Sequence, residues 1–148
     1  MNDTDRIDRH RGWIAGLLLV LGVPQGLLGV WALFAPHSFY ANLGIGSGHW
    51  VAALGAYDEH LVRDIGSLFI GLGVLMVIAA IRLQRSLTYI AVAVWLTFAV
   101  PHTIWHMFNL GPYSATDAVA NVISLGWTVV GGLVILALLR DSRQRVRG

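Results

Sequence analysis

The sequence predicts an all-α fold, in which residues 1–148 form one integral membrane four-helix bundle with antiparallel up-down topology. Of the 148 residues, 56% are hydrophobic and only 12% are charged, which is about half the charged share of a typical soluble domain. Four stretches reach the roughly 20 apolar residues that cross a bilayer, namely 13–34, 60–81, 87–108 and 116–139. Too little chain remains for a separate soluble domain.

The distribution of positive charge predicts the orientation. All ten basic residues are arginines, and nine lie in three clusters that four crossings bring to one face. By the positive-inside rule that face is cytoplasmic, so we expect a plasma membrane protein with both termini in the cytoplasm. The basic residues then contact anionic membrane lipids, and nucleic acid is excluded as a partner. The clusters are Arg6, Arg9 and Arg11; Arg82 and Arg85; and Arg140, Arg143, Arg145 and Arg147.

The first stretch is too long for the core of a signal peptide, and Pro24 with Gln25 predicts a kink in its helix. The connection 35–58 is the longest, with a flexible "GIGSG" and an apolar "HWVAALGAY" expected along the membrane interface. The short "RLQRS" turn makes the second and third helices an antiparallel pair. Ser114 or Thr116 caps the fourth helix, and Asp117 is favourable at its positive end.

Ionisable residues gather at the outer ends of three predicted helices, in "YDEHLVRD", "PHTIWH" and "TDAVANVIS". Residues four apart share a helical face. On antiparallel helices, His60 lies level with His106 and Asp64 level with His102. Burying such groups in a bilayer costs several kcal/mol unless they are partnered, so a polar pocket is expected in the outer leaflet. The pairs that share a face are His60 with Asp64, Glu59 with Arg63, His102 with His106, and Asp117 with Asn121.

A metal centre is the first interpretation of this pocket. His60, His102 and His106 with Asp64 or Glu59 would suit zinc, iron, manganese or copper, giving a metal-dependent enzyme or redox protein that acts on a lipophilic molecule. The carboxylate that is not a ligand could be a base, and Arg63 could orient it or bind an anion. Asp117 and Asn121 would support the ligands. Since the chain has no cysteine, thiolate sites and covalently attached haem are excluded, leaving non-covalent haem between His60 and His102 or His106.

Two other interpretations stay open. The pocket could perform metal-free acid–base chemistry as an isomerase, cyclase or hydrolase for a lipophilic substrate. Alternatively, Arg63, the carboxylates and the histidines fix the helix register, and the protein is an accessory subunit of a membrane redox complex or forms homo-oligomers. Arg63 is expected to pair with Glu59 or Asp117. Other residues are expected to be solvated (His10, His37, His49), interface anchors (Trp13, Trp31, Trp50, Trp105) or packing residues (Trp95, Trp127).

The motifs "YDEHLVRDIGSLFIGLGVL" and "WLTFAVPHTIWHMFNL" resemble a group of uncharacterised actinobacterial four-helix membrane proteins. The pattern of that group is roughly YNEHLVRD followed by FAVPHxxxH, and Asp58 replaces its usual asparagine. More distantly, the chain is similar in size and topology to the DoxX-like group, whose members are tied to membrane redox complexes. The resemblance implies the four-helix fold and leaves the activity open.

Overall fold

The computed structural model describes residues 7, 10–45 and 49–144, with side chains as far as Asp141. Four long helices are apolar enough to cross a membrane, which confirms the predicted all-α, four-span architecture. A short helix and a single 3-10 turn lie in the connection between the first two spans. The order is α1 (Arg11–Phe34), α2 (Pro36–Asn42), η2 (Ala52–Leu54), α3 (Glu59–Arg82), α4 (Arg85–Phe108) and α5 (Ala115–Gln144).

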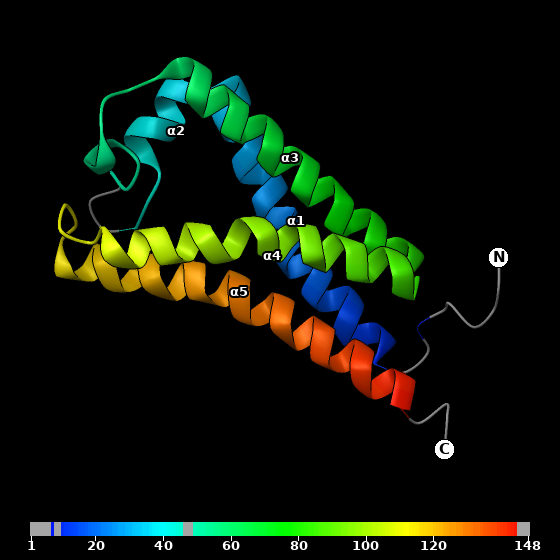
Figure 1. Ribbon diagram of the computed structural model, residues 1–148. Helices are drawn as coiled ribbons and strands as arrows, with labels where there is room; N and C mark the ends of the chain where they lie inside the picture. The colour runs from blue at the N-terminus through cyan, green and yellow to red at the C-terminus, as the bar shows by residue number, and fades with distance from the viewer. Residues whose placement is uncertain (1–6, 8–9, 46–48, 145–148) are drawn as a thin grey trace.

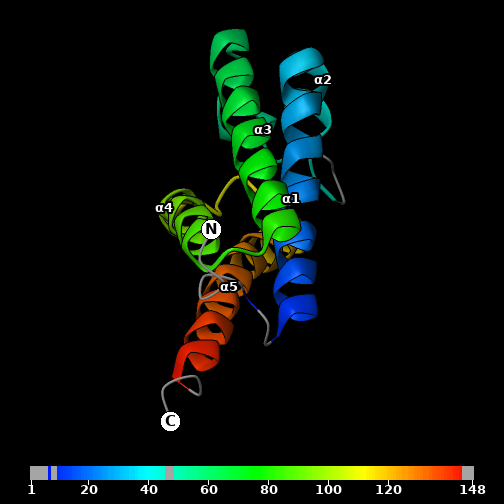
Figure 2. The ribbon, with the colours of Figure 1, turned by 90° about the vertical axis from the view of Figure 1, so that its right-hand side faces the viewer.

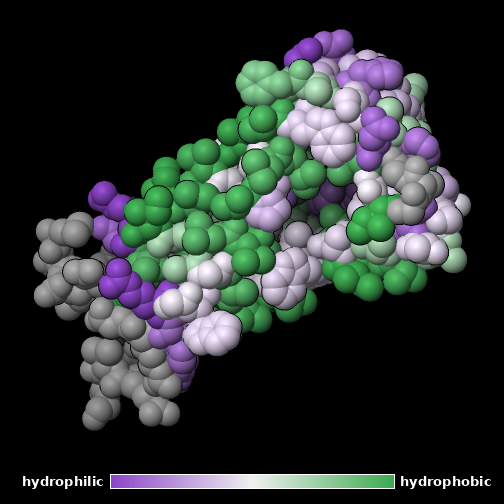
Figure 3. All heavy atoms as spheres, turned by 180° about the vertical axis from the view of Figure 1, so that it is seen from behind, coloured by the Kyte–Doolittle hydropathy of each residue, from purple (hydrophilic) through white to green (hydrophobic). Residues whose placement is uncertain are grey.

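The four long helices form two arms, α1 with α3 and α4 with α5 (Figure 1). The arms cross near the end that carries the α3–α4 turn and diverge toward the other end, where α2 and the following loop lie between them (Figures 1 and 2). In the space-filling view, hydrophobic residues cover the middle of the molecule, and hydrophilic residues gather at its two ends (Figure 3). This distribution suits a multi-pass membrane protein.

Glycines bring α1 and α3 into backbone contact. A Cβ atom on Gly66 would lie 2.6 Å from the backbone nitrogen of Leu33, and one on Gly29 would lie 2.7 Å from the carbonyl oxygen of Gly66. Gly22 and Gly73 repeat this arrangement deeper in the membrane. Small residues let transmembrane helices approach closely and gain van der Waals contact. The α1–α3 arm is therefore held mainly by close packing.

Side-chain hydrogen bonds join α4 to α5. The indole Nε1 of Trp95 donates to the carbonyl oxygen of Thr128 at 3.0 Å, and Thr103 Oγ1 donates to the carbonyl oxygen of Leu125 at 3.4 Å. At the crossing end, Arg85 Nη1 donates to the carbonyl oxygen of Leu139 at 2.6 Å. These bonds satisfy polar groups inside an apolar environment and set the antiparallel register of the two helices.

The connection 35–58 contains more structure than its sequence predicts. Helix α2 begins with a proline at its first position, where the missing N–H costs nothing, and Phe39 packs edge-on against Trp31 with ring centroids 5.6 Å apart. The segment expected along the interface holds only the half-buried turn η2. Residues 46–48 of "GIGSG" lie outside the described residues.

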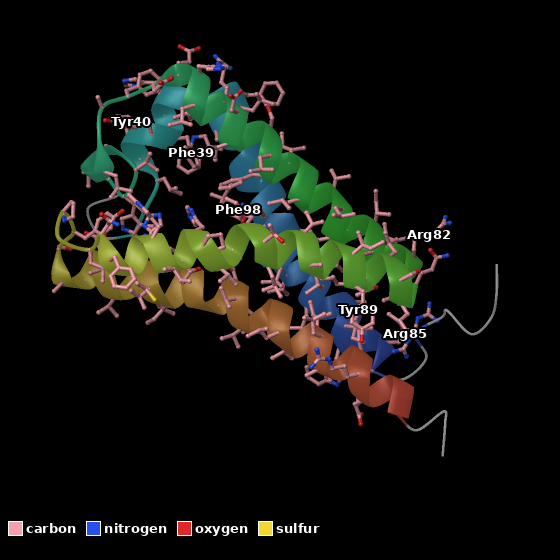
Figure 4. The ribbon with its side chains drawn as sticks, viewed as in Figure 1. Phe39, Tyr40, Arg82, Arg85, Tyr89 and Phe98 are labelled. Carbon is pink, nitrogen blue, oxygen red and sulfur yellow. The ribbon has the colours of Figure 1, made fainter. Side chains whose placement is uncertain are left out.

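The described arginines of the three clusters lie at one end of the molecule and Arg63 lies at the other, as the charge pattern predicts. Arg82 and Arg85 lie beside the turn between α3 and α4 (Figure 4). His10, expected to be solvated, is instead half-buried, and its Nε2 lies 2.9 Å from Asp141 Oδ2. This contact ties the start of α1 to the end of α5. The side chains of Arg6, Arg9, Arg143, Arg145 and Arg147 lie outside the described residues.

Candidate functional site

The first predicted pair lies at the start of α3 but faces away from the bundle. His60 and Asp64 are in contact, with His60 Nε2 3.4 Å from Asp64 Oδ2, yet their side chains are 88% and 63% exposed. The reason is helical geometry. Val62 packs into the core, and residues two apart are about 200° apart around a helix. Because the apolar and glycine positions determine which face of α3 is buried, His60 and Asp64 point outward.

Arg63 forms an ion pair with Glu59, the first of its two predicted partners. Its Nη2 lies 2.7 Å from Glu59 Oε1, and its Nε donates to the same oxygen at 2.8 Å. Its Nη1 also donates to the carbonyl oxygen of Leu33, in the last turn of α1. That carbonyl has no partner within its own helix, so Arg63 fastens α3 to α1. Glu59 and Arg63 thus serve the α1–α3 arm.

The second histidine pair lies on α4 as its spacing predicts. The rings of His102 and His106 meet edge to face, with centroids 4.6 Å apart. His102 is half-buried and stacks on Phe98, with centroids 4.9 Å apart and planes 22° apart. His106 lies behind it, only 8% exposed, and touches Trp105. The two imidazoles are therefore fixed by aromatic contacts in the last two turns of a helix that is long and apolar enough to span a membrane.

A buried carboxylate begins α5. Asp117 is 1% exposed and accepts hydrogen bonds from Trp50 Nε1 at 2.8 Å and from Ser114 Oγ at 2.6 Å. Ser114 Oγ also accepts from the backbone N–H of Asp117 at 3.1 Å, so it caps the helix as one of the predicted alternatives. The predicted pairing of Arg63 with Asp117 is not made, because the guanidinium is bound to Glu59 and to the carbonyl oxygen of Leu33 instead.

Trp50, expected as an interface anchor, is half-buried and is bound to the start of α5 and to the turn before it. Its carbonyl oxygen accepts from the hydroxyl of Tyr113 at 2.9 Å, and Gly44 packs against its ring. Burial, and then the charge of Asp117, raise the pKa of Tyr113, so its hydroxyl stays a donor. The connection between α1 and α3 is thereby attached to the start of α5. Its signal in the sequence is a tryptophan beside glycines in a long loop.

Within the described part of the chain, two polar atoms of this region are buried without a hydrogen-bond partner, His106 Nδ1 and Asn121 Oδ1. Asn121 is 3% exposed. Thr103 bonds to the carbonyl of Leu125. His106 lies three residues further along α4 and Asn121 four residues back along α5, so the two residues lie at nearly the same level of the antiparallel pair. Buried polar groups are ordinarily paired, and leaving one unpaired costs about 1–3 kcal/mol. Both unpaired atoms therefore lie at one depth of the α4–α5 arm.

The predicted three-histidine centre is not assembled. Among residues 7, 10–45 and 49–144, no group of three or more His, Asp or Glu side chains could hold a metal ion. The expected match in level between His60 and His106 along antiparallel helices says nothing about the lateral distance between them, and the two arms that carry them diverge (Figure 1). The structure brings His102 and His106 together and places Asp117 and Asn121 on the adjoining helix. It leaves Glu59, His60, Arg63 and Asp64 on the other arm.

A hollow opens between the diverging arms. The space-filling view shows it near the outer end, with hydrophilic residues at its bottom (Figure 3). Phe39 of α2 and Phe98 of α4 lie on opposite sides of the space between the arms (Figure 4), and Phe98 carries the stacked His102 ring. Deeper in the membrane, Phe98 meets Phe69 of α3 at 5.4 Å between centroids, which closes the space where the arms converge.

Comparison of this chain with known protein families, with curated proteins and with solved structures finds no match.

Proposed function

We propose that the protein is a membrane enzyme that binds a lipophilic molecule between its two arms and transfers a proton to and from that molecule through His102, with His106 beside it. The observation that carries the proposal is the environment of His102. Its ring is half-buried and fixed on Phe98, and no hydrogen bond from its nitrogens to another described residue is present. A neutral imidazole offers one donor and one acceptor, so a polar group of a bound molecule would complete it.

The surroundings favour a lipophilic substrate. The site lies within α4, one of the four candidate membrane spans, and Phe39, Phe69 and Phe98 line the approach from the arms. An apolar body would bury against these rings, while a hydroxyl or carbonyl group would meet His102. Most of the affinity for such a molecule comes from apolar area, and the few polar groups fix its orientation.

Isomerisation or cyclisation fits this set of groups. One imidazole can take a proton from one position of a substrate and return it to another, so the reaction needs no oxidant, reductant or second substrate. His106, whose Nδ1 has no hydrogen-bond partner among the described residues, adjoins this ring. A metal-dependent reaction would need a third protein ligand beside the two histidines, and no described His, Asp or Glu side chain supplies it.

The test starts from protein purified from its native membrane in a mild detergent. Organic extracts of the wild type, of His102→Ala and of His60→Ala are compared by mass spectrometry, since His60 is an exposed histidine on the other arm. We expect one lipophilic compound to accompany the wild type and His60→Ala but not His102→Ala, at equal thermal stability. Equal retention by all three variants contradicts the proposal.

A second measurement tests the proton transfer itself. The retained compound is incubated with each variant in D2O, and incorporation of deuterium at carbon is measured by mass spectrometry. Wild type and His60→Ala should catalyse the exchange, and His102→Ala should not. If the wild type binds the compound but does not catalyse the exchange, the protein is a carrier of the molecule and the proposed proton transfer is contradicted.

A further inference from the structure

The side chains of His106 and Asn121 oppose each other across the interface between α4 and α5. A Cβ atom on Gly132 would lie 2.8 Å from Leu96 Cδ2 and 3.5 Å from Trp95 Cδ1, so this part of α5 packs directly on α4. His106 lies eleven residues after Trp95, and Asn121 lies eleven residues before Gly132. Eleven residues make about three turns of an α-helix, so both side chains return to the faces that meet at Trp95 and Gly132.

No direct hydrogen bond joins the two opposed side chains. Both residues are almost fully buried, and His106 Nδ1 and Asn121 Oδ1 have no hydrogen-bond partner among the described residues. One turn away, Thr103 Oγ1 donates to the carbonyl oxygen of Leu125 at 3.4 Å, whereas hydroxyl donors usually lie about 2.7–2.8 Å from their acceptors. The helices are therefore not in their closest contact at this level, which accounts for the missing direct bond.

The chemistry of the two atoms selects the molecule that can join them. Asn121 Oδ1 can only accept a hydrogen bond, and His106 Nδ1 accepts one when the ring proton is on Nε2. A water molecule has two donors and can bond to both atoms at once. Buried waters in proteins ordinarily bridge polar groups that otherwise lack partners. The burial of both side chains leaves no access for a larger ligand.

We propose that His106 and Asn121 together bind one water molecule between α4 and α5, and that this water makes Asn121 a positioning residue for His106. The water donates to Asn121 Oδ1 and to His106 Nδ1, so the proton of the neutral ring stays on Nε2. The consequence for the reaction rests on the proposed function. With Nδ1 occupied by the water, Nε2 is the nitrogen of His106 that remains to act beside His102.

The test uses the full chain, labelled with 13C,15N-histidine and placed in lipid bilayers in alkaline buffer, where imidazoles are neutral. Magnetic resonance shifts of the ring atoms identify which nitrogen carries the proton, and the signals lost in His106→Phe belong to His106. We expect an unprotonated Nδ1 that receives magnetisation from water. A protonated Nδ1, or no transfer from water to Nδ1, overturns the proposal. The wild-type spectrum decides this without substrate and without any further variant.

Matched variants locate the water. Asn121→Leu removes the acceptor and should abolish the transfer from water to His106 Nδ1. Asn109→Leu removes an amide that donates to the carbonyl oxygen of Trp105 in its own helix, and it should keep the transfer. A water signal that is unchanged in Asn121→Leu refutes the site.

Thermal unfolding measures the coupling between the two residues. Asn121→Leu and His106→Phe should each lower the unfolding midpoint by roughly 5 °C, because each leaves the other buried atom without a partner. The double variant removes both polar groups and should be more stable than either single variant. Additive losses in the double variant contradict the proposal.

The exchange of the retained compound in D2O tests the positioning role. Asn121→Leu should still retain the compound but should incorporate deuterium roughly tenfold more slowly than the wild type. Loss of the water signal without any slowing of the exchange refutes the positioning role. Absence of exchange in the wild type contradicts the proposed function instead, and the spectrum of His106 then still decides whether the water is bound.

Discussion

In the two arms of this protein, different interactions hold the paired helices together. In the α1–α3 arm, glycines let the backbones touch, Arg63 binds a carbonyl oxygen of α1, and His60 and Asp64 are left on the outside. In the α4–α5 arm, the interface contains hydrogen-bonding side chains, including the two polar atoms that lack a partner. Close packing in which the polar groups are satisfied suits a scaffold, and an interface with unsatisfied polar groups suits a site. Chemistry is therefore expected in the second arm.

The largest effect is expected from a methyl group in the glycine contact. Gly66→Ala would place a Cβ 2.6 Å from the backbone of Leu33, and because backbone cannot rotate away as a side chain can, the free energy of unfolding should fall by about 3 kcal/mol. Gly71→Ala on the same helix meets nothing within 4 Å and should be neutral. Unfolding in mixed micelles measures both, and equal losses would refute the scaffold role of the first arm.

A smaller loss is expected where the long connection meets the second arm. Trp50→Phe removes the N–H that the buried Asp117 carboxylate accepts, and hydrogen bonds to charged groups contribute about 2 kcal/mol. Trp31→Phe, which removes a 3.2 Å donor to the neutral hydroxyl of Ser38, is the control and should cost about half as much. The same unfolding assay compares them, and a larger loss for Trp31→Phe would contradict the prediction.

Within the α4–α5 interface, Thr103→Val keeps the shape of the side chain and removes its hydrogen bond to the carbonyl of Leu125. Interhelical hydrogen bonds in membranes average about 0.6 kcal/mol, so the free energy of unfolding should fall by about that amount. Thr97→Val removes only a bond to its own helix, from Thr97 Oγ1 to the Ala93 carbonyl, and should leave the stability nearly unchanged. Indistinguishable results for the two variants would show that the hydroxyl at 103 does not join the helices.

The smallest effect on the free energy of unfolding is expected from the charged residues at the start of α3, which the sequence placed in the site. Glu59→Gln weakens an exposed ion pair with Arg63, and such pairs contribute less than about 1 kcal/mol. Unfolding should change by less than about 0.5 kcal/mol, and the amount of lipophilic compound extracted with the protein should not change. A loss of that compound would return Glu59 to the site and would contradict the assignment of function to the second arm.

Hydropathy predicts the four spans well, because each helix must be long and apolar throughout. The starts of the four long helices agree with the predicted stretches within two residues, and α5 extends five residues beyond its predicted end. The short α2 was missed because seven residues are too few for such a pattern. The sequence also did not predict which face of α3 is buried against its partner helix. The glycine positions that bury Val62 and expose His60 are visible in the sequence, but their partner helix is not.

In the candidate site, too, features within one helix were predicted from the sequence, and contacts between distant segments were not. The spacing of His102 and His106 determines that their rings share a face, and the structure confirms it. The partner of Asp117 depends on the path of a long connection, so Trp50 from that connection takes the place that was expected for Arg63. Spacing within one helix is readable from sequence alone, whereas contacts between segments far apart depend on how the arms diverge.

The divergence of the arms also has a mechanical consequence for the surrounding bilayer. A protein whose helices meet at one surface and separate toward the other occupies a larger cross-section in one leaflet (Figure 1). This difference in cross-section between the leaflets is accommodated most easily where the bilayer is curved, with the wider end of the protein in the convex leaflet. Many copies would therefore collect at curved regions and would resist being placed in a flat one.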